Sequence, residues 1–292
     1  YCFMLKGSIV ALITPFKDDS LDEENYIKLI DYHLKNGTNG IVPGGTTGES
    51  PTLSHNEHKK IIEISVKECN SKIPVISGTG SNSTDEAIEL SKFAEKAGSD
   101  ALLIVTPYYN KPNQEGLYQH YKKINDSVGI PIVIYNIPSR SVIDMSVETM
   151  TKLYELKNII GVKDATGDLK RVELQKKAMG NDFIQLTGND DNALEFNKLG
   201  GVGAIGVTAN IAAKLSCEFQ KACAENINKA AEINKILQPL HTAMFLESNP
   251  SPVKYAASLL KMCSPTVRLP LVEVHETSKK KISEALKAAK IL

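Results

Sequence analysis

The chain has 292 residues, of which 42% are hydrophobic and 23% charged, a composition typical of soluble globular proteins. Its 34 basic and 34 acidic residues cancel, so the net charge indicates no nucleic-acid or membrane-surface partner. No apolar run approaches the roughly 20 residues of a transmembrane helix. The five cysteines form no CxxC motif and no metal-ligand spacing, which indicates reduced thiols and predicts a cytoplasmic protein.

Eight short β-rich segments recur along the chain, at intervals of about 30 residues that shorten toward the end. Some of them are continuous apolar runs, such as Ala-Leu-Leu-Ile-Val from residue 101, which indicates a parallel sheet buried on both faces. The predicted strands are 8–14, 40–44, 74–78, 101–107, 131–135, 159–164, 183–188 and 203–208.

The segments between these strands carry helix signals. Ser54 and Ser83 each stand three residues before a glutamate, Glu57 and Glu86, which is the pattern of a capping box. Beyond residue 211 only helical periodicity remains, at 213–226, 229–245, 253–262 and 273–291.

We therefore predict an α/β fold, a (β/α)8 TIM barrel over residues 4–211, with a small C-terminal helical region over residues 212–292. The alternative is a doubly wound open sheet. No GxGxxG motif follows the first strand, and eight regular units favour the barrel.

Unusual residues gather where the predicted strands end, the place where TIM barrels carry their active sites. A Gly-Gly-Thr-Thr-Gly-Glu turn occupies residues 44–49 after the second strand. Pro-Tyr-Tyr-Asn follows the fourth at 107–110, and Tyr-Asn-Ile-Pro-Ser-Arg ends the fifth at 135–140. The sixth holds Gly-Val-Lys-Asp at 161–164, and the seventh ends in Gly-Asn-Asp-Asp at 188–191.

Lys163 is the strongest single signal, because it follows an apolar run in a strand expected to be buried. Burial would disfavour its charged form and lower its pKa, as a nucleophilic amine requires. A structural ion pair with a carboxylate such as Asp164 would also place a lysine here. Position alone leaves both interpretations open.

The other polar residues at the strand ends also have two interpretations. Tyr135 and Tyr109 are either packing aromatics or parts of a hydroxyl relay. The turn containing Thr46 and Thr47 is either a tight loop or a nest for a carboxylate. Arg140 is either a surface arginine or a bidentate carboxylate clamp.

Asp190 and Asp191 have no histidine or further carboxylate at metal-ligand spacing. They therefore favour a helix N-terminus over a metal site. We predict no metal.

Taken together, these segments resemble the dihydrodipicolinate synthase branch of the pyruvate-dependent Schiff-base aldolase and lyase family. The resemblance extends over nearly the whole chain, from residue 11 to residue 254. Any one of its motifs would be a weak signal, but all of them occur here in order. The most specific are GGTTGES (44–50), TPYYNKP (106–112), YNIPSR (135–140), GVKDATGD (161–168) and GAIGVTAN (203–210).

The resemblance implies an enzyme that condenses pyruvate with L-aspartate 4-semialdehyde in lysine and diaminopimelate biosynthesis, without a metal or organic cofactor. Lys163 would form the imine with pyruvate. Tyr135 would relay protons in a triad with Thr46 and Tyr109, the latter from a neighbouring subunit of a homodimer or homotetramer. Imine formation supplies an electron sink at C2, so that C3 can lose a proton and attack the aldehyde.

The resemblance also implies the substrate contacts. Thr47 would bind the pyruvate carboxylate, Arg140 would hold the carboxylate of the semialdehyde, and Gly188 and Ile205 would line the pocket. After the arginine, relatives often have Thr followed by a small residue, whereas this chain has Ser141 and then a valine.

Two alternatives remain open. N-acetylneuraminate lyase and 2-keto-3-deoxy sugar acid aldolases resemble the chain in the barrel and the lysine. The lyases tend to have Ser-Thr in place of Thr46-Thr47, and they lack the arginine. The second alternative is a protein of another class, a non-catalytic barrel that only binds a keto acid or an amino acid.

The resemblance further implies feedback inhibition by L-lysine at a separate site. The chain has suitable polar side chains at each position that contacts the inhibitor in lysine-sensitive relatives. These positions are Ser50, His55, His58, Asn82, Glu86 and Tyr108.

Overall fold

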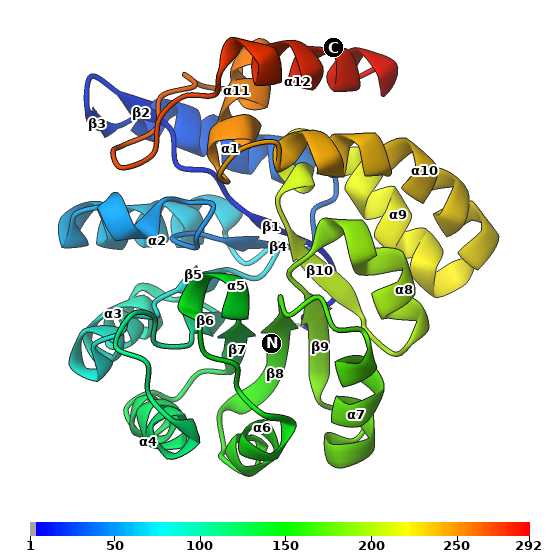
Figure 1. Cartoon of the computed structure of the whole chain (residues 1–292). Coiled ribbons are helices and arrows are strands. Elements are labelled where there is room, and N and C mark those ends of the chain that lie inside the picture. Colours follow the sequence, from blue (N-terminus) through cyan, green and yellow to red (C-terminus); the bar gives the residue numbers. More distant parts are fainter. Residues whose placement is uncertain (1–3) are drawn as a thin grey trace.

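The computed structural model describes residues 4–292. Eight parallel strands form one sheet in the order β4-β1-β10-β9-β8-β7-β6-β5, with helices arranged around it (Figure 1). The strands are β1 (Gly7–Ala11), β4 (Gly40–Val42), β5 (Ile76–Gly78), β6 (Ala101–Val105), β7 (Ile132–Asn136), β8 (Ile159–Asp164), β9 (Ile184–Thr187) and β10 (Gly203–Gly206).

The two outer strands of this order, β4 and β5, also meet. A parallel bridge joins Ile41 to Val75, the Ile41 amide donates to the Pro74 carbonyl at 3.0 Å, and the Gly78 amide donates to the Pro43 carbonyl at 2.9 Å. The sheet therefore closes on itself, and the predicted barrel is confirmed.

The first strand ends three residues earlier than predicted. The side chain of Asn210 takes over the hydrogen bonds at this point, because its Nδ2 donates to the Ala11 carbonyl at 2.8 Å and its Oδ1 accepts from the Ile13 amide at 3.1 Å. A two-stranded hairpin that was not predicted follows, with β2 (Phe16–Lys17) paired to β3 (Ser20–Leu21). Both residues of its turn have positive φ, as a tight hairpin turn requires.

Helices alternate with the strands around the barrel. The capping box at Ser54 and Glu57 is confirmed. Of the one predicted at Ser83 and Glu86, only the bond to the Ser83 side chain forms, so the prediction of a complete capping box is wrong. Ser83 accepts from the Glu86 amide at 3.4 Å, whereas the Glu86 carboxylate turns away to other partners. The helices are α1 (Glu23–Lys35), α2 (His55–Cys69), α3 (Thr84–Ala97), α4 (Gln114–Asn125), α5 (Pro138–Ser141), α6 (Val147–Tyr154), α7 (Lys170–Met179) and α8 (Ala193–Lys198), with short 3-10 helices η1 (Ser50–Thr52), η2 (Asp190–Asn192) and η3 (Thr208–Asn210).

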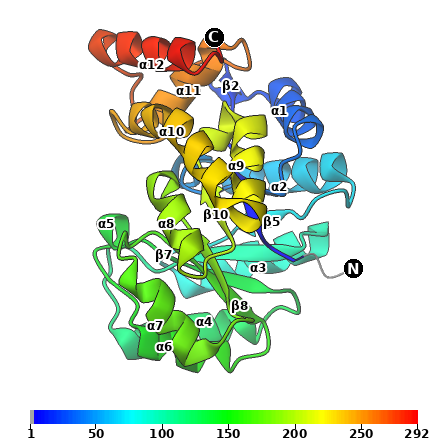
Figure 2. The same cartoon turned by 90° about the vertical axis from the view of Figure 1, so that its right-hand side faces the viewer.

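Four helices follow the barrel, as predicted: α9 (Ala213–Glu225), α10 (Ile227–Met244), α11 (Ser251–Leu259) and α12 (Glu276–Ala288). Helix α11 begins two residues before the predicted start, because Pro252 is tolerated in the first helical turn. Helices α10, α11 and α12 lie together on one side of the barrel in both views (Figures 1 and 2).

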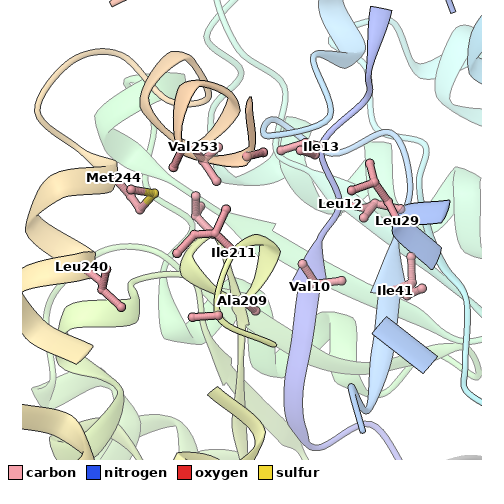
Figure 3. Close-up of a cluster of buried hydrophobic side chains, with 14 of the residues drawn as sticks. Val10, Leu12, Ile13, Leu29, Ile41, Ala209, Ile211, Leu240, Met244 and Val253 are labelled. Carbon is pink, nitrogen blue, oxygen red and sulfur yellow. The ribbon is translucent and has the colours of Figure 1, made fainter. Parts of the chain in front are cut away.

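The C-terminal helices share a hydrophobic core with the barrel. Val10 and Ile41 from the strands occur in one buried cluster with Leu240, Met244 and Val253 from the helices (Figure 3). The division at residue 211 stays a prediction, and the packing joins the two parts through apolar contacts.

Among residues 4–292, no helix is long and apolar enough to cross a lipid bilayer. The four cysteines in this range are free, at positions 69, 217, 223 and 263. Burial raises the pKa of the Cys69 thiol to about 12 and that of Cys263 to about 11. Cys2, the fifth cysteine, lies outside the described residues.

Candidate active site

Lys163 lies inside the barrel near the carboxyl end of β8, with 6% of its surface exposed. It is paired in register with Tyr135 on the adjacent strand β7. The Lys163 Nζ lies 4.1 Å from the centroid of the Tyr135 ring, which is cation–π distance. The register of two neighbouring strands therefore brings the two predicted catalytic residues together.

Asp164 lies next to Lys163 in sequence but makes its contacts elsewhere, as expected from the alternation of side chains along a strand. Its Oδ1 accepts from the amide and the hydroxyl of Thr166, at 2.9 and 2.6 Å, and its Oδ2 is 3.9 Å from Arg171 Nε. Within residues 4–292, no carboxylate oxygen lies within 4.0 Å of Lys163 Nζ. The alternative of an ion pair between Lys163 and Asp164 is therefore wrong, and the amine forms no salt bridge within the described part of the chain.

Gly188 follows β9 beside the lysine. A Cβ placed there would lie 2.9 Å from Ala165 Cβ, closer than real Cβ atoms approach, and 3.0 Å from Lys163 Cε, which is a tight contact. A larger residue at position 188 would therefore displace Ala165 or the lysine side chain. Ile205, on β10, is 1% exposed and belongs to the same apolar cluster in the barrel as Tyr135 and Ala165.

The glycine-rich turn after β4 holds Thr46 and Thr47. Gly44 has φ +68°, and a side chain there would collide with His58, so both backbone and space require glycine. Thr46 is half-buried, whereas Thr47 is 3% exposed. The Thr47 hydroxyl accepts a hydrogen bond from Nδ2 of Asn249 at 3.0 Å.

A cavity of about 590 Å³ opens beside this turn. Thr46 and Arg140 line it together with five of the six residues predicted for lysine binding. Asn82, the sixth, is not among the lining residues, but its Nδ2 donates to the Tyr108 carbonyl at 3.0 Å. The predicted residues that line the cavity are Thr46, Ser50, His55, His58, Glu86, Tyr108 and Arg140.

Arg140 lies exposed on the single-turn helix α5 at the rim of this cavity. No side chain within residues 4–292 forms a salt bridge with it. The loop behind it is held by the Ser141 hydroxyl, which bonds the carbonyls of Ile137 at 2.9 Å and Ile143 at 3.0 Å. Val142, which follows, has φ +69°, a conformation that is costly for a β-branched residue. Ser141 thus provides a hydroxyl that holds the loop, whereas the valine that follows it strains the backbone near Arg140.

Tyr109 does not reach the site of its own chain. It is 92% exposed and has φ +74°. No hydrogen bond joins it to Thr46 or Tyr135 within the described part of the chain. The predicted relay is therefore not assembled in a single chain.

The residues at the far side of the cavity are tied to one another. Glu86 accepts from the Ser81 hydroxyl and bonds His55 Nε2 at 2.7 Å. These contacts, the one from Ser81 first, lower the pKa of Glu86, so the carboxylate stays ionised. His58 is buried and donates from Nε2 to the Gly78 carbonyl at 2.7 Å, and burial lowers its pKa.

Asp190 has a structural role that the sequence did not reveal. Its Oδ2 accepts from the amides of Val207 and Thr208, at 2.8 and 3.0 Å, and so holds the start of η3. The predicted helix N-terminus is confirmed as well, because Asp190 and Asp191 lie in the first turn of η2, directly before α8. No group of three His, Cys, Asp or Glu residues that could hold a metal ion occurs between residues 4 and 292.

Sequence reasoning missed a second buried lysine. Lys254, on α11, is fully buried and donates to Glu49 Oε2 and to the Thr14 carbonyl, both at 2.8 Å. Burial lowers the pKa of Lys254, and the neighbouring Glu49 opposes this effect. The lysine inside the apolar segment Pro-Val-Lys-Tyr-Ala-Ala was the available signal.

Comparison with known proteins shows what the chain is similar to over nearly its whole length. Residues 4–289 match the model of the Dihydrodipicolinate synthetase family. A relative from Pelagibacter ubique, named 4-hydroxy-tetrahydrodipicolinate synthase, is 68% identical over 99% of this chain and 100% of its own.

Two solved structures are also similar to the whole chain. The first is the chloride-inhibited dihydrodipicolinate synthase from Acinetobacter baumannii complexed with pyruvate (TM-score 0.97, 45% identity, 99% of this chain and 100% of that chain). The second is the enzyme from Cyanidioschyzon merolae with lysine bound (TM-score 0.95, 34% identity, 98% and 99%). The chain therefore belongs to the dihydrodipicolinate synthetase family.

Proposed function

We propose that the protein is a Schiff-base lyase that condenses pyruvate with L-aspartate 4-semialdehyde to give 4-hydroxy-tetrahydrodipicolinate, a step of lysine and diaminopimelate biosynthesis. The observation that carries this proposal is the buried amine of Lys163, which lies over the ring of Tyr135 and has no carboxylate within 4.0 Å among the described residues. The name of the Pelagibacter relative and the pyruvate in the Acinetobacter structure support the same reaction. A cytoplasmic location remains a prediction.

Lys163 is the nucleophile in the proposed mechanism. Its amine attacks C2 of pyruvate, water leaves, and a protonated imine forms. The protonated imine withdraws electrons from C3, so C3 loses a proton and the imine becomes an enamine. C3 of this enamine then attacks the aldehyde carbon of the second substrate. The bound imine itself supplies the electron sink, so the chemistry requires no metal or organic cofactor.

Tyr135 is the proposed proton relay. The Tyr135 ring centroid lies 4.1 Å from Lys163 Nζ, which supports a role of its phenol in proton transfer while the carbinolamine and the imine form. Thr46 and a tyrosine from a second subunit complete the relay in this proposal. The high exposure and positive φ of Tyr109 support a role outside its own chain, and hence a homodimer or homotetramer.

Pyruvate is expected to bind between the glycine-rich turn and the barrel strands. Thr47 offers a hydroxyl to the pyruvate carboxylate, and the missing side chain at Gly188 leaves room beside Lys163. Ile205 supplies an apolar wall.

A substitution of Arg140 tests whether L-aspartate 4-semialdehyde is the second substrate. Arg140→Ala should spare formation of the pyruvate imine but weaken use of the semialdehyde, because the charge-assisted bond to its carboxylate is lost. A bond of this kind contributes about 1.5–3 kcal/mol, or roughly a 10- to 150-fold loss in kcat/KM. Steady-state kinetics with each substrate varied would measure the change, and Lys122→Ala, on the outer helix α4, provides a control with a similar change of charge.

Two results would overturn the synthase proposal. One is an unchanged kcat/KM for the semialdehyde in Arg140→Ala. The other is a higher kcat/KM for N-acetylneuraminate or a 2-keto-3-deoxy sugar acid. Absence of turnover with every substrate tried, despite tight binding of pyruvate, would favour a binding protein.

L-Lysine is the proposed inhibitor, bound at a site separate from Lys163, in the cavity of about 590 Å³ beside the glycine-rich turn. The Glu86 carboxylate is ionised and half-buried, and an ammonium group would compete with His55 for it. Asn82 fixes the backbone of Tyr108, the residue before Tyr109, which offers a route from the inhibitor to the relay. The lysine bound in the Cyanidioschyzon enzyme supports this proposal.

Millimolar lysine should therefore inhibit the enzyme, with a coupling free energy of about 1–3 kcal/mol between the two sites. Glu86→Gln should abolish inhibition, because it removes the charge that pairs with the ammonium group. Glu89→Gln is the matched control, since Glu89 lies one turn further along α3 and pairs with Lys59 at 3.0 Å. Equal inhibition of both variants, or no calorimetric signal for lysine binding to the unchanged protein, would show that Glu86 has only a structural role.

A further inference from the structure

The turn that carries Thr46 and Thr47 is held from behind by the C-terminal region. Asn249 donates to Thr47, as described above, and Lys254 donates to Glu49. The backbone amide of Arg268 donates to the other oxygen of Glu49 at 3.0 Å. Both oxygens of the Glu49 carboxylate are thus engaged by residues more than 200 positions away in sequence.

The contact between Asn249 and Thr47 has a defined direction. A threonine hydroxyl has one hydrogen to donate and two lone pairs to accept with, whereas an amide nitrogen only donates. Because Asn249 Nδ2 occupies a lone pair of Thr47 Oγ1, the hydroxyl hydrogen remains available for another acceptor. A carboxylate is a pure acceptor.

The rest of the Asn249 side chain favours a functional role. Asn249 is 6% exposed, yet its Oδ1 has no hydrogen-bond partner among residues 4–292. A buried carbonyl oxygen without a partner costs stability. An asparagine kept here at that cost, with its nitrogen directed at Thr47, is better explained by the orientation of the hydroxyl than by stability.

We propose that Asn249 is a positioning residue for keto-acid recognition. It fills the acceptor side of the Thr47 hydroxyl and so directs the hydroxyl hydrogen toward the carboxylate of pyruvate. The buried pair of Lys254 and Glu49 fixes the turn that carries Thr47, which keeps this geometry in place. The inference rests on the proposed function, because the role of Thr47 toward pyruvate is part of it.

Kinetics of Asn249 variants test the inference. Asn249→Ala removes the donor and lets the hydroxyl turn freely, so the KM for pyruvate should rise by about 3- to 10-fold, the range for one neutral hydrogen bond, with kcat changed less than about twofold. Asn249→Asp should raise the KM more, because a carboxylate accepts the Thr47 hydrogen and also repels the substrate. Asn226→Ala, which removes the N-cap of α10 in the same region, should lower the melting temperature and leave the KM unchanged.

A double-mutant cycle separates action through Thr47 from a general effect on structure. Thr47→Val should itself raise the KM for pyruvate, and adding Asn249→Ala to it should produce no further rise. An additional rise as large as that of the single variant would overturn the positioning role. An unchanged KM in Thr47→Val would instead show that the proposed contact of Thr47 with pyruvate is wrong. If Asn249→Ala does not fold, Asn249→Leu, which is closer in volume and also removes the donor without adding a charge, gives the same comparison alone and combined with Thr47→Val.

Discussion

Treatment of the protein with pyruvate and sodium borohydride should irreversibly modify one lysine, Lys163. The amine lies inside the barrel without a carboxylate partner among the described residues, so its lone pair can attack the keto carbon once the proton is lost. Reduction converts the imine to a stable secondary amine. Peptide mapping by mass spectrometry would locate the modified residue.

The chain provides its own control for this experiment. Lys254 is the other deeply buried lysine, but it is paired with Glu49 and sealed among Thr14 and Phe16, with its Nζ 4.2 Å from the Phe16 ring centroid. It should remain unmodified.

Replacement of Lys163 should abolish both labelling and turnover. Lys163→Met keeps a side chain of similar length, and its activity should fall on the order of 10⁴-fold or more, as when other enzymes lose their nucleophile. Labelling of a different lysine, or none, would reject the Schiff-base mechanism.

Tyr135→Phe should slow turnover by about 10²–10⁴-fold, the usual contribution of one general acid–base group. The substitution keeps the ring over which Lys163 Nζ lies and removes only the hydroxyl, so the position of the lysine should be preserved. Stopped-flow or steady-state assays would measure the loss, and circular dichroism would check the fold.

Tyr26→Phe is the matched control for the loss of a tyrosine hydroxyl. Tyr26 is buried on α1, and its hydroxyl forms a hydrogen bond of 2.9 Å with Ser65 Oγ on α2. This variant should be less stable but retain its activity. An equal loss of turnover in Tyr26→Phe and Tyr135→Phe would argue against a relay at Tyr135.

Mixing subunits extends this test to Tyr109. If Tyr109 acts across an interface, a pair made of one Tyr109→Phe chain and one Tyr135→Phe chain contains one intact site. Activity should therefore recover when the two variants are mixed and exchange subunits. No recovery after demonstrated exchange would place Tyr109 in the site of its own chain.

The sequence was sufficient to predict the barrel, because its signals are local and repeated. Eight apolar segments separated by helix signals leave few other ways to bury both faces of a parallel sheet. The position of Lys163 at a strand end was equally visible. Its freedom from Asp164 was not, because the side chain of Asp164 is drawn to Thr166 and Arg171 on another element.

Local patterns failed where a residue outside the pattern offered a better contact. Glu86 has the spacing of a capping box, but Ser81 and His55 bind its carboxylate instead. The first strand was expected to continue to residue 14, but Asn210, which is 199 residues from Ala11, bonds its backbone there.

The amino-acid sequence by itself thus determined the approximate positions of the eight barrel strands and of the four C-terminal helices, and the residues able to carry chemistry, since these depend on periodicity and residue type over short distances. Only the tertiary structure decided which of them act together. Asn249 meets Thr47 across 202 positions and Lys254 meets Glu49 across 205. No short-range pattern encodes such contacts, because they arise only when α11 packs against the closed barrel.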